Sequence, residues 1–169
     1  MSIRYRPAEP DDSERLVALF HDSFRDTFGP LYDPQDLALF LAGHTAENWR
    51  DQLESDDFAV RLAEEDNELI GFIKLGPVKL PVEPRGKAVE LRQLYVLAPW
   101  QGSGAAQELM DWGMAEARRR GADELYLAVF TDNRRARRFY GRYGFDEVGP
   151  YAFMVGNQAD EDVIMRLAL

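Results

Sequence analysis

Two glycines and a serine, Gly102-Ser103-Gly104, separate a short apolar run from an uninterrupted helical pattern in the stretch QLYVLAPWQGSGAAQELMDWGMAEA. A helix that begins directly behind a glycine turn points unpaired backbone N–H groups and the positive end of its dipole at one place. Glycine permits positive φ angles and close approach of the backbone, and the two alanines that follow keep the first helical turn small. These residues therefore predict an anion site suited to a pyrophosphate.

Two common nucleotide motifs fit this loop poorly. A nucleotide P-loop needs a Lys-Ser or Lys-Thr pair after its last glycine, whereas Gly104 is followed by Ala105 and Ala106. A dinucleotide fingerprint needs a third glycine or alanine placed for a different crossover and an acidic partner in a second parallel unit, which the sequence lacks at the expected spacing. Neither motif therefore explains this loop.

A second stretch, NRRARRFYGRYGF, follows after one helical pattern and one strand pattern. Asn133 is a suitable N-cap, and Ala136, Phe139, Tyr140 and Tyr143 form an i, i+3, i+4, i+7 stripe. This stripe predicts a short helix with one packed face. The arginines between the apolar positions form either a solvated face or a partner for phosphate groups.

Together the two stretches resemble the acetyl-CoA signature of the GNAT superfamily of N-acetyltransferases. The first matches its Gln/Arg-x-x-Gly-x-Gly/Ala pattern at Gln101, Gly104 and Ala106, with glutamine where many relatives have arginine and alanine in place of the last glycine. The second matches the family's next motif at Asn133, Ala136, Phe139, Tyr140, Gly144 and Phe145. The stretches DTFGPLYDPQDLALFL and YAFMVGNQADEDVIMRL further resemble a bacterial branch that includes polyamine acetylators.

The resemblance implies a binding mode for acetyl-CoA. Backbone groups of Leu94 and Val96 would pair with the pantetheine arm as though it were an added strand, and the amides of the glycine loop would hold the pyrophosphate. Tyr140 would be the general acid toward the coenzyme sulfur, although its place in the apolar stripe also fits a core aromatic. The implied coenzyme-binding residues are Leu94, Val96, Gln101, Gly102, Ser103, Gly104, Ala105, Ala106 and Asn133.

Acetyl transfer to an amine also needs a proton acceptor. An alkyl ammonium with a pKa near 10.4 carries about 4.6 kcal/mol of deprotonation cost at pH 7. Glu90 is our candidate base, because it lies an even number of residues before Leu94 and Val96 and should share their side of the strand. A relay of the proton through water is one alternative, and a solvent-facing glutamate paired with Arg92 or a neighbouring lysine is another. His21 and His44 fit surface or internally satisfied residues better than a base.

Composition limits the class of protein. The chain has 169 residues, 46% of them hydrophobic and 12% aromatic, which suits one well-cored domain spanning 1–169. No apolar run approaches the roughly 20 residues of a membrane span, and the N-terminus lacks a signal-peptide pattern, so we expect a soluble cytoplasmic protein without membrane partners. There is no cysteine and there are two histidines, so we expect no metal.

The net charge of −10 argues against nucleic-acid binding. Residues 101–145 hold eight arginines against six carboxylates, whereas the remainder carries twelve basic and twenty-four acidic residues. The first segment suits an anionic cofactor. The acidic remainder suits a cationic partner, or a solvated surface that aids solubility.

The elements point to an α/β fold of the α+β type. We expect helices after Asp12, from Pro34 and from Thr45, then a hairpin between Phe58 and Lys79. The other expected elements are strands in 2–8, 87–97, 124–130, 151–155 and 162–169, helices in 105–120 and 133–143, and a Pro-rich loop in 81–86. The resemblance implies a mostly antiparallel central sheet that splays in a V around Val96 and Val129, and exposed strand edges allow a homodimer.

The sequence thus predicts an N-acetyltransferase that moves an acetyl group from acetyl-CoA to a primary amine. The most specific form of this prediction is that the amine is a polyamine-like small cation. A non-catalytic module that binds or senses acyl-CoA is the alternative. A structural protein with an incidental glycine loop is the third possibility, and it predicts no coenzyme A binding.

Overall fold

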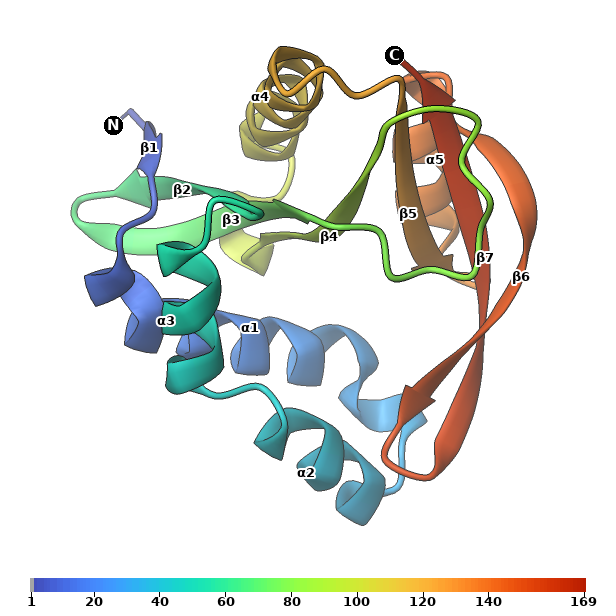
Figure 1. The fold of residues 1–169 in the computed structure, drawn as a ribbon. Helices are drawn as coiled ribbons and strands as arrows, with labels where there is room; N and C mark the ends of the chain where they lie inside the picture. Colours follow the sequence, from blue (N-terminus) through green and yellow to red (C-terminus); the bar gives the residue numbers. More distant parts are fainter. Residues whose placement is uncertain (1) are drawn as a thin grey trace.

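The computed structural model describes residues 2–169, whose strands form one sheet in the order β1-β2-β3-β4-β5-β7-β6 (Figure 1). Neighbouring strands are antiparallel except for β4 and β5, so the expected mixed, mostly antiparallel sheet is confirmed. The strands are β1 (Arg4–Pro7), β2 (Ala59–Glu65), β3 (Glu68–Gly76), β4 (Ala88–Val96), β5 (Glu124–Phe130), β6 (Asp146–Val155) and β7 (Gln158–Ala168).

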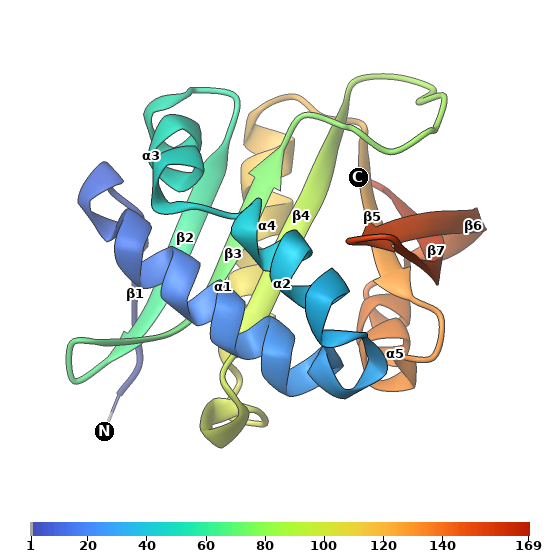
Figure 2. The same ribbon diagram turned by 90° about the horizontal axis from the view of Figure 1, so that it is seen from below.

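Helices cover both faces of the sheet (Figure 2). One apolar core joins the sheet to α4 and α5, and a second joins it to α1, α2 and α3. The helices are α1 (Ser13–Phe28), α2 (Pro34–Ala42), α3 (Ala46–Glu54), α4 (Ala105–Arg119) and α5 (Arg134–Arg142), with 3-10 turns η1 (Pro10–Asp12), η2 (Gly29–Leu31) and η3 (Ala98–Trp100). Within residues 2–169, no helix has both the length and the apolar character needed to cross a membrane.

Local sequence explains several of these boundaries. The side chain of Thr45 accepts a hydrogen bond from the Asn48 amide at 3.1 Å, which caps α3 where the sequence predicts a helix start. Asp66 and Asn67, with φ of 51° and 66°, form the two-residue turn between β2 and β3. The hairpin expected between Phe58 and Lys79 is therefore confirmed.

The sheet opens between β4 and β5. Their parallel pairing is confined to Ala88–Glu90 against Glu124–Tyr126, and beyond this vertex the strands diverge (Figure 1). Val96 and Val129 lie in the diverging part, so the expected V-shaped splay is confirmed. On the far side of the V, β7 pairs with both β5 and β6. β6 begins at Asp146, earlier than the expected range, because its pairing with β7 continues past an irregularity between Glu147 and Gly149.

Candidate active site

The glycine loop has the backbone conformation that its sequence predicts. Gly102 and Gly104 have φ of 83° and 91°, and Gly104 is the N-cap of α4. Apart from the glycine itself and its two chain neighbours, no described atom lies within 4 Å of the position that a Cβ would take at either residue. The left-handed backbone, rather than a lack of space, therefore requires glycine here, because it costs other L-residues roughly 1 to 2 kcal/mol. Ser103 Oγ accepts a hydrogen bond of 3.3 Å from the Ala105 amide, which braces the turn.

A cleft of about 350 Å³ lies beside this loop, and residues of both sequence motifs line it. The expected coenzyme-binding residues that line this cleft are Leu94, Val96, Gln101, Ala106 and Asn133. Gln101 connects the two motifs, because its Nε2 donates to the Val96 carbonyl at 3.2 Å and its Oε1 accepts from Arg135 on α5. Asn133 caps α5 through a bond of 3.2 Å from the Ala136 amide, as expected.

The edge of β4 that faces the splay presents backbone groups to the cleft, and the Val96 carbonyl among them accepts a hydrogen bond from Gln101. The Leu97 amide donates to the Ile70 carbonyl at 2.8 Å, so it points toward the β3 side. Since successive residues of a strand point their polar groups to opposite edges, those of Val96 and Leu94 point toward the splay. An extended ligand could pair there as an added strand.

A second cavity of about 350 Å³ lies on the side of the sheet that α1 and α2 cover. It meets the first cleft within the V, because six residues line both. These are Phe28, Leu94, Tyr95, Asn133, Ala136 and Tyr140. A ligand in one cavity can therefore contact a ligand in the other at this junction.

Tyr140 lies at the junction and also belongs to the apolar core, so its two expected descriptions are compatible. It is 8% exposed and packs edge-on against Phe139 and Phe145. Burial raises the pKa of the Tyr140 hydroxyl above its ordinary value of 10.0, so it is protonated at neutral pH. A neutral phenol at this position can donate a proton.

Aromatic rings form one wall of the second cavity. Phe20, Phe24 and Phe40 contact one another, with ring centroids 4.6 to 6.3 Å apart. His44 packs between Phe20 and Phe40 at 4.5 and 4.7 Å, and burial is the main cause that lowers the pKa of His44 to about 4. It is therefore neutral at pH 7 and a weak base. Such a wall suits a methylene chain or an alkyl ammonium.

Glu90 lines this second cavity, but the prediction that its side chain lies on the same side of the strand as those of Leu94 and Val96 is wrong. Lys74 pairs with Gln93 and Leu75 pairs with Leu91, so Arg92 is an extra residue on β4. Such a bulge reverses the alternation of side chains, so an even spacing no longer means a shared face. Leu91 and Leu94 accordingly lie on the α4 side of the sheet, and Glu90 opens to the other side.

The expected pairing of Glu90 with Arg92 is present, but the expected solvent-facing position is wrong, because Glu90 is 9% exposed. Its Oε1 accepts hydrogen bonds from the amides of Lys79 and Leu80 at 2.8 and 3.3 Å, and its Oε2 lies 3.5 Å from Arg92 Nε. It therefore holds the start of the loop after β3 while it faces the cavity. The structure leaves its candidate role as base a prediction.

Two further carboxylates in the second cavity escaped the sequence analysis. Asp160 and Asp162 lie two residues apart on β7 and are 9% and 8% exposed. The Tyr32 hydroxyl donates a hydrogen bond to Asp160. Among residues 2–169, none donates a hydrogen bond to the Asp162 carboxylate or forms an ion pair with it. Burial, followed by the charge of Asp160, raises the pKa of Asp162 to about 7. Their i, i+2 spacing within a strand pattern was the available signal.

A sheet that splays beside a glycine turn, with a second cavity joined to the first cleft at the splay, defines the class of coenzyme-dependent acyltransferases. The sequence pattern of the Acetyltransferase (GNAT) family matches residues 14–145, and the chain belongs to this family. It is accordingly an acyltransferase of the acetyl-CoA-dependent N-acetyltransferase class.

Individual relatives agree with this assignment. An uncharacterised N-acetyltransferase of Mycobacterium tuberculosis is 30% identical over 155 residues, covering 91% of this chain and 96% of that protein. The aminoalkylphosphonate N-acetyltransferase of Salmonella typhimurium is 32% identical over 142 residues and 84% of each chain. The PaiA N-acetyltransferase of Thermoplasma acidophilum, solved with coenzyme A, has the same fold, with a TM-score of 0.80 at 21% identity over 100% of both chains.

Proposed function

We propose that residues 1–169 act as one catalytic domain that transfers an acetyl group from acetyl-CoA to a primary amine, with a polyamine-like small cation as the acceptor. The observation that carries this proposal is the junction of the two cavities at six shared residues. It allows a thioester on one side and an amine on the other to meet beside Tyr140.

The first cleft suits the donor. The turn at Gly102 and Gly104, with the amides of residues 102–106 at the start of α4, is arranged for a pyrophosphate. The open β4 edge at Leu94 and Val96 suits the pantetheine arm. Charge-assisted hydrogen bonds contribute roughly 1.5 to 3 kcal/mol each, so several of them support micromolar affinity without a metal. Coenzyme A in the PaiA structure supports the same donor.

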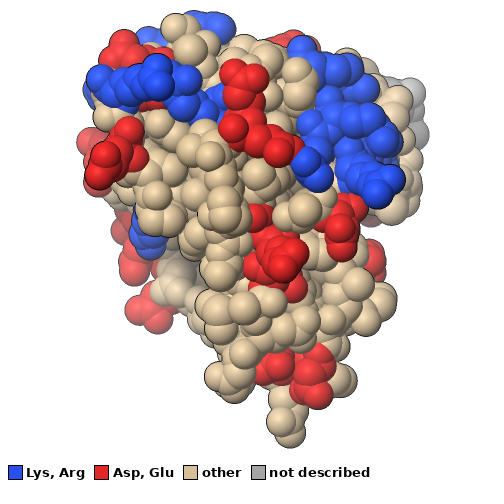
Figure 3. Space-filling view, turned by 90° about the vertical axis from the view of Figure 1, so that its right-hand side faces the viewer, with Lys and Arg blue, Asp and Glu red and all other residues tan. Residues whose placement is uncertain are grey.

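The second cavity suits a cationic acceptor. Glu90, Asp160 and Asp162 face it, and of the two cations that line it, Arg92 is engaged with Glu90 and the Pro77 carbonyl, and Lys79 is exposed. On the face that carries β6 and β7, carboxylates interrupt an uncharged centre and lower part, and basic side chains gather above (Figure 3). The three carboxylates of the cavity favour an ammonium group flanked by methylenes.

The reaction follows from these positions. A carboxylate of the second cavity takes a proton from the ammonium, and the free amine attacks the thioester carbonyl to form the C–N bond. Collapse of the tetrahedral intermediate breaks the C–S bond. Tyr140 protonates the departing thiolate and regains a proton from the amide nitrogen, so amide, thiol and one released proton balance the reaction.

A panel of amines tests the proposal. Acetyl-CoA is mixed with spermidine, an amino acid, an aminoalkylphosphonate and a peptide with a free N-terminus, and thiol release is measured. We expect the fastest release with spermidine. Coenzyme A binding by calorimetry without turnover of any amine would favour the sensing module, and absence of binding would favour a structural protein.

Substitution of Tyr140 separates catalysis from binding. Tyr140→Phe should lower kcat at least tenfold and leave the Kd of coenzyme A nearly unchanged, because the ring remains and the proton donor is lost. Tyr143→Phe is the matched control, since Tyr143 lies on the same face near the end of α5 and lines neither cavity. Unchanged turnover in Tyr140→Phe removes Tyr140 from the mechanism.

A further inference from the structure

Three carboxylates face the acceptor cavity, and they differ in the hydrogen-bond and ion-pair partners that each already has. Glu90 already accepts hydrogen bonds from two backbone amides and forms an ion pair with Arg92, so its oxygens have partners within the chain. Asp160 accepts a hydrogen bond from Tyr32. Asp162 has no such donor among residues 2–169, so its lone pairs remain available to a ligand in the cavity.

Asp162 lies on β7, in the arm of the V that faces β4 across the cavity. It pairs in the sheet with Phe130 at the end of β5 and with Tyr151 on β6. Burial is the largest cause that raises the pKa of Tyr95, a junction residue, followed by the charges that Tyr140, when ionised, and Asp162 place near it. Asp162 and Tyr140 are therefore both close to the place where acyl donor and amine would meet.

We infer that Asp162, rather than Glu90, takes the proton from the acceptor's ammonium group, an inference that rests on the proposed function. The buried carboxylate without a partner first forms an ion pair with the R–NH₃⁺ group. One N–H bond then breaks and an O–H bond forms on Asp162, which leaves R–NH₂ with the electron pair that attacks the thioester carbonyl. Asp162 releases this proton to solvent after the product leaves.

The surroundings make Asp162 a suitable proton acceptor near neutral pH. A base with a pKa near the working pH combines a useful ionised fraction with a useful driving force. Burial and the neighbouring Asp160 bring the pKa of Asp162 to about 7. The titratable groups that share the cavity are Asp160 on β7, Tyr151 on β6, Tyr95, Glu90 and Arg92 on β4, Tyr140 on α5, Tyr32 after η2, His44 after α2, and Lys79 in the loop after β3.

The pH dependence of kcat/KM tests the inference, with acetyl-CoA and spermidine as the probes. For the wild type, kcat/KM should rise tenfold per pH unit up to about 7 and then level off. In Asp162→Asn, kcat/KM at pH 7 should be at least 100-fold lower than in the wild type. Its kcat/KM should continue to rise up to the amine's own pKa near 10, because the unassisted reaction needs the free amine. The ratio of wild-type to variant kcat/KM should therefore fall about tenfold per pH unit above pH 7.

Controls separate this result from misfolding. Asp162→Asn should retain coenzyme A affinity within about twofold, and Asp162→Glu should restore part of the rate together with the break near pH 7. Glu161→Gln is the matched control, because Glu161 is the exposed neighbour on β7 and should leave the profile unchanged.

Two outcomes overturn the inference alone: a wild-type profile without a break between pH 6 and 8, or a break that Glu90→Gln abolishes and Asp162→Asn keeps. Absence of wild-type turnover with every amine of the panel overturns the proposed function, and the inference with it.

Discussion

The pKa values of two pairs of buried carboxylates in this protein are shifted in opposite directions. Asp12 and Glu64 are 5% and 3% exposed, and Asp160 and Asp162 are 9% and 8% exposed. The first pair lies where β1 and α1 meet β2, and the second lines the second cavity. Because residue types and burial are similar, the difference must come from their partners.

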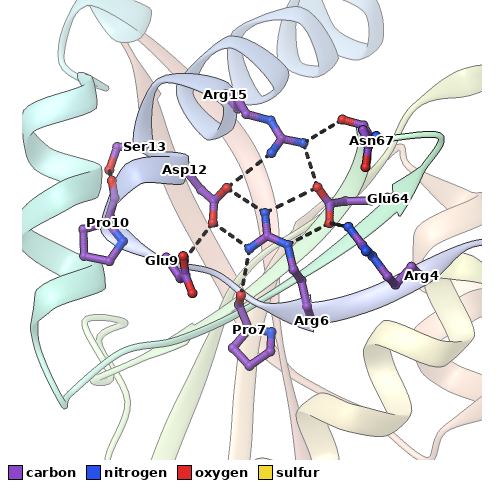
Figure 4. A network of polar contacts seen from close by, with 10 residues as sticks. All are labelled: Arg4, Arg6, Pro7, Glu9, Pro10, Asp12, Ser13, Arg15, Glu64 and Asn67. Carbon is purple, nitrogen blue, oxygen red and sulfur yellow. Dashed lines mark hydrogen bonds and ion pairs between the residues drawn. The ribbon is translucent and has the colours of Figure 1, made fainter.

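The first pair is surrounded by guanidinium groups (Figure 4). Arg6 bonds both carboxylates, at 2.8 and 2.9 Å to Asp12 and at 2.7 Å to Glu64, and Arg15 reaches Glu64 at 2.9 Å. Hydrogen bonds from Arg6 are the largest cause that lowers the pKa of both, to about 2 for Glu64. These charges are fixed, and the cluster ties the start of α1 to the sheet.

The second pair has a phenol and aromatic rings as neighbours and no cation bonded to it among residues 2–169. Burial therefore dominates and raises the pKa of both carboxyls, to about 7 for Asp162. Desolvation acts in the same direction in both pairs, and the presence or absence of arginine decides the sign. A buried carboxylate that the chain leaves without a cation is a place where the substrate can supply one.

Glu64→Gln should produce the largest change in stability. Glu64 is buried but its arginine partners are partly exposed, so we expect a loss of at most about 3 kcal/mol in the free energy of unfolding by urea at pH 7, the size of its pKa shift at 1.36 kcal/mol per unit. Glu68→Gln, at an exposed position on β3, is the control and should change it by less than about 0.5 kcal/mol.

The pH dependence of that loss checks its cause. The folded pKa of Glu64, about 2, lies below the ordinary 4.5, so its contribution is complete above about pH 4.5 and is lost as the pH falls toward 2. A loss that is the same at pH 3 and pH 7 would show that packing, rather than charge, stabilises this cluster.

Asp162→Asn should raise the stability of the protein, by less than Glu64→Gln lowers it. The folded pKa of Asp162, about 7, lies above the ordinary 3.8, so stability falls as the pH rises from about 4 through 7. At 1.36 kcal/mol per unit the shift corresponds to at most about 4 kcal/mol, and the amide keeps part of the burial cost, so we expect a gain of about 2 kcal/mol at pH 8. The gain should vanish near pH 4 in urea unfolding.

A gain at pH 8 together with slower catalysis would mean that Asp162 is retained for function at the expense of stability. A loss at pH 8 would mean instead that Asp162 has a stabilising partner in the folded protein. Glu161→Gln, exposed on the same strand, should change the stability by less than about 0.5 kcal/mol.

Features that depend on neighbouring residues could be predicted from the sequence. The positive φ angles at Gly102 and Gly104 and the cap at Asn133 depend on a few adjacent residues, and the structure has both where expected. The sheet class and the splay came from the family resemblance carried by the same motifs. The junction beside Tyr140 follows from the meeting of those motifs across the V.

Features that depend on strand pairing could not be predicted. The face of Glu90 is decided by the bulge at Arg92, which is a property of the β3–β4 register rather than of β4 alone. Asp162 lies in the stretch ADEDV, which is typical of a solvated surface. It becomes buried because β7 inserts between β5 and β6 and brings this stretch against the aromatic rings of α1 and α2.

Tyr32→Phe should give the smallest effect and test the link between the two aspartates. The Tyr32 hydroxyl donates to Asp160, which favours the ionised pair. Without this donor the pair should hold its proton more tightly, so the break in kcat/KM should move upward by up to about one pH unit, or roughly 1 kcal/mol. The phenylalanine ring keeps the stack on Phe24, with centroids 5.9 Å apart. The plateau at high pH should be unchanged, and Tyr143→Phe should not move the break. A break that stays in place or moves downward would mean that Tyr32 does not stabilise the anion, and that Asp160 acts on Asp162 through its charge alone.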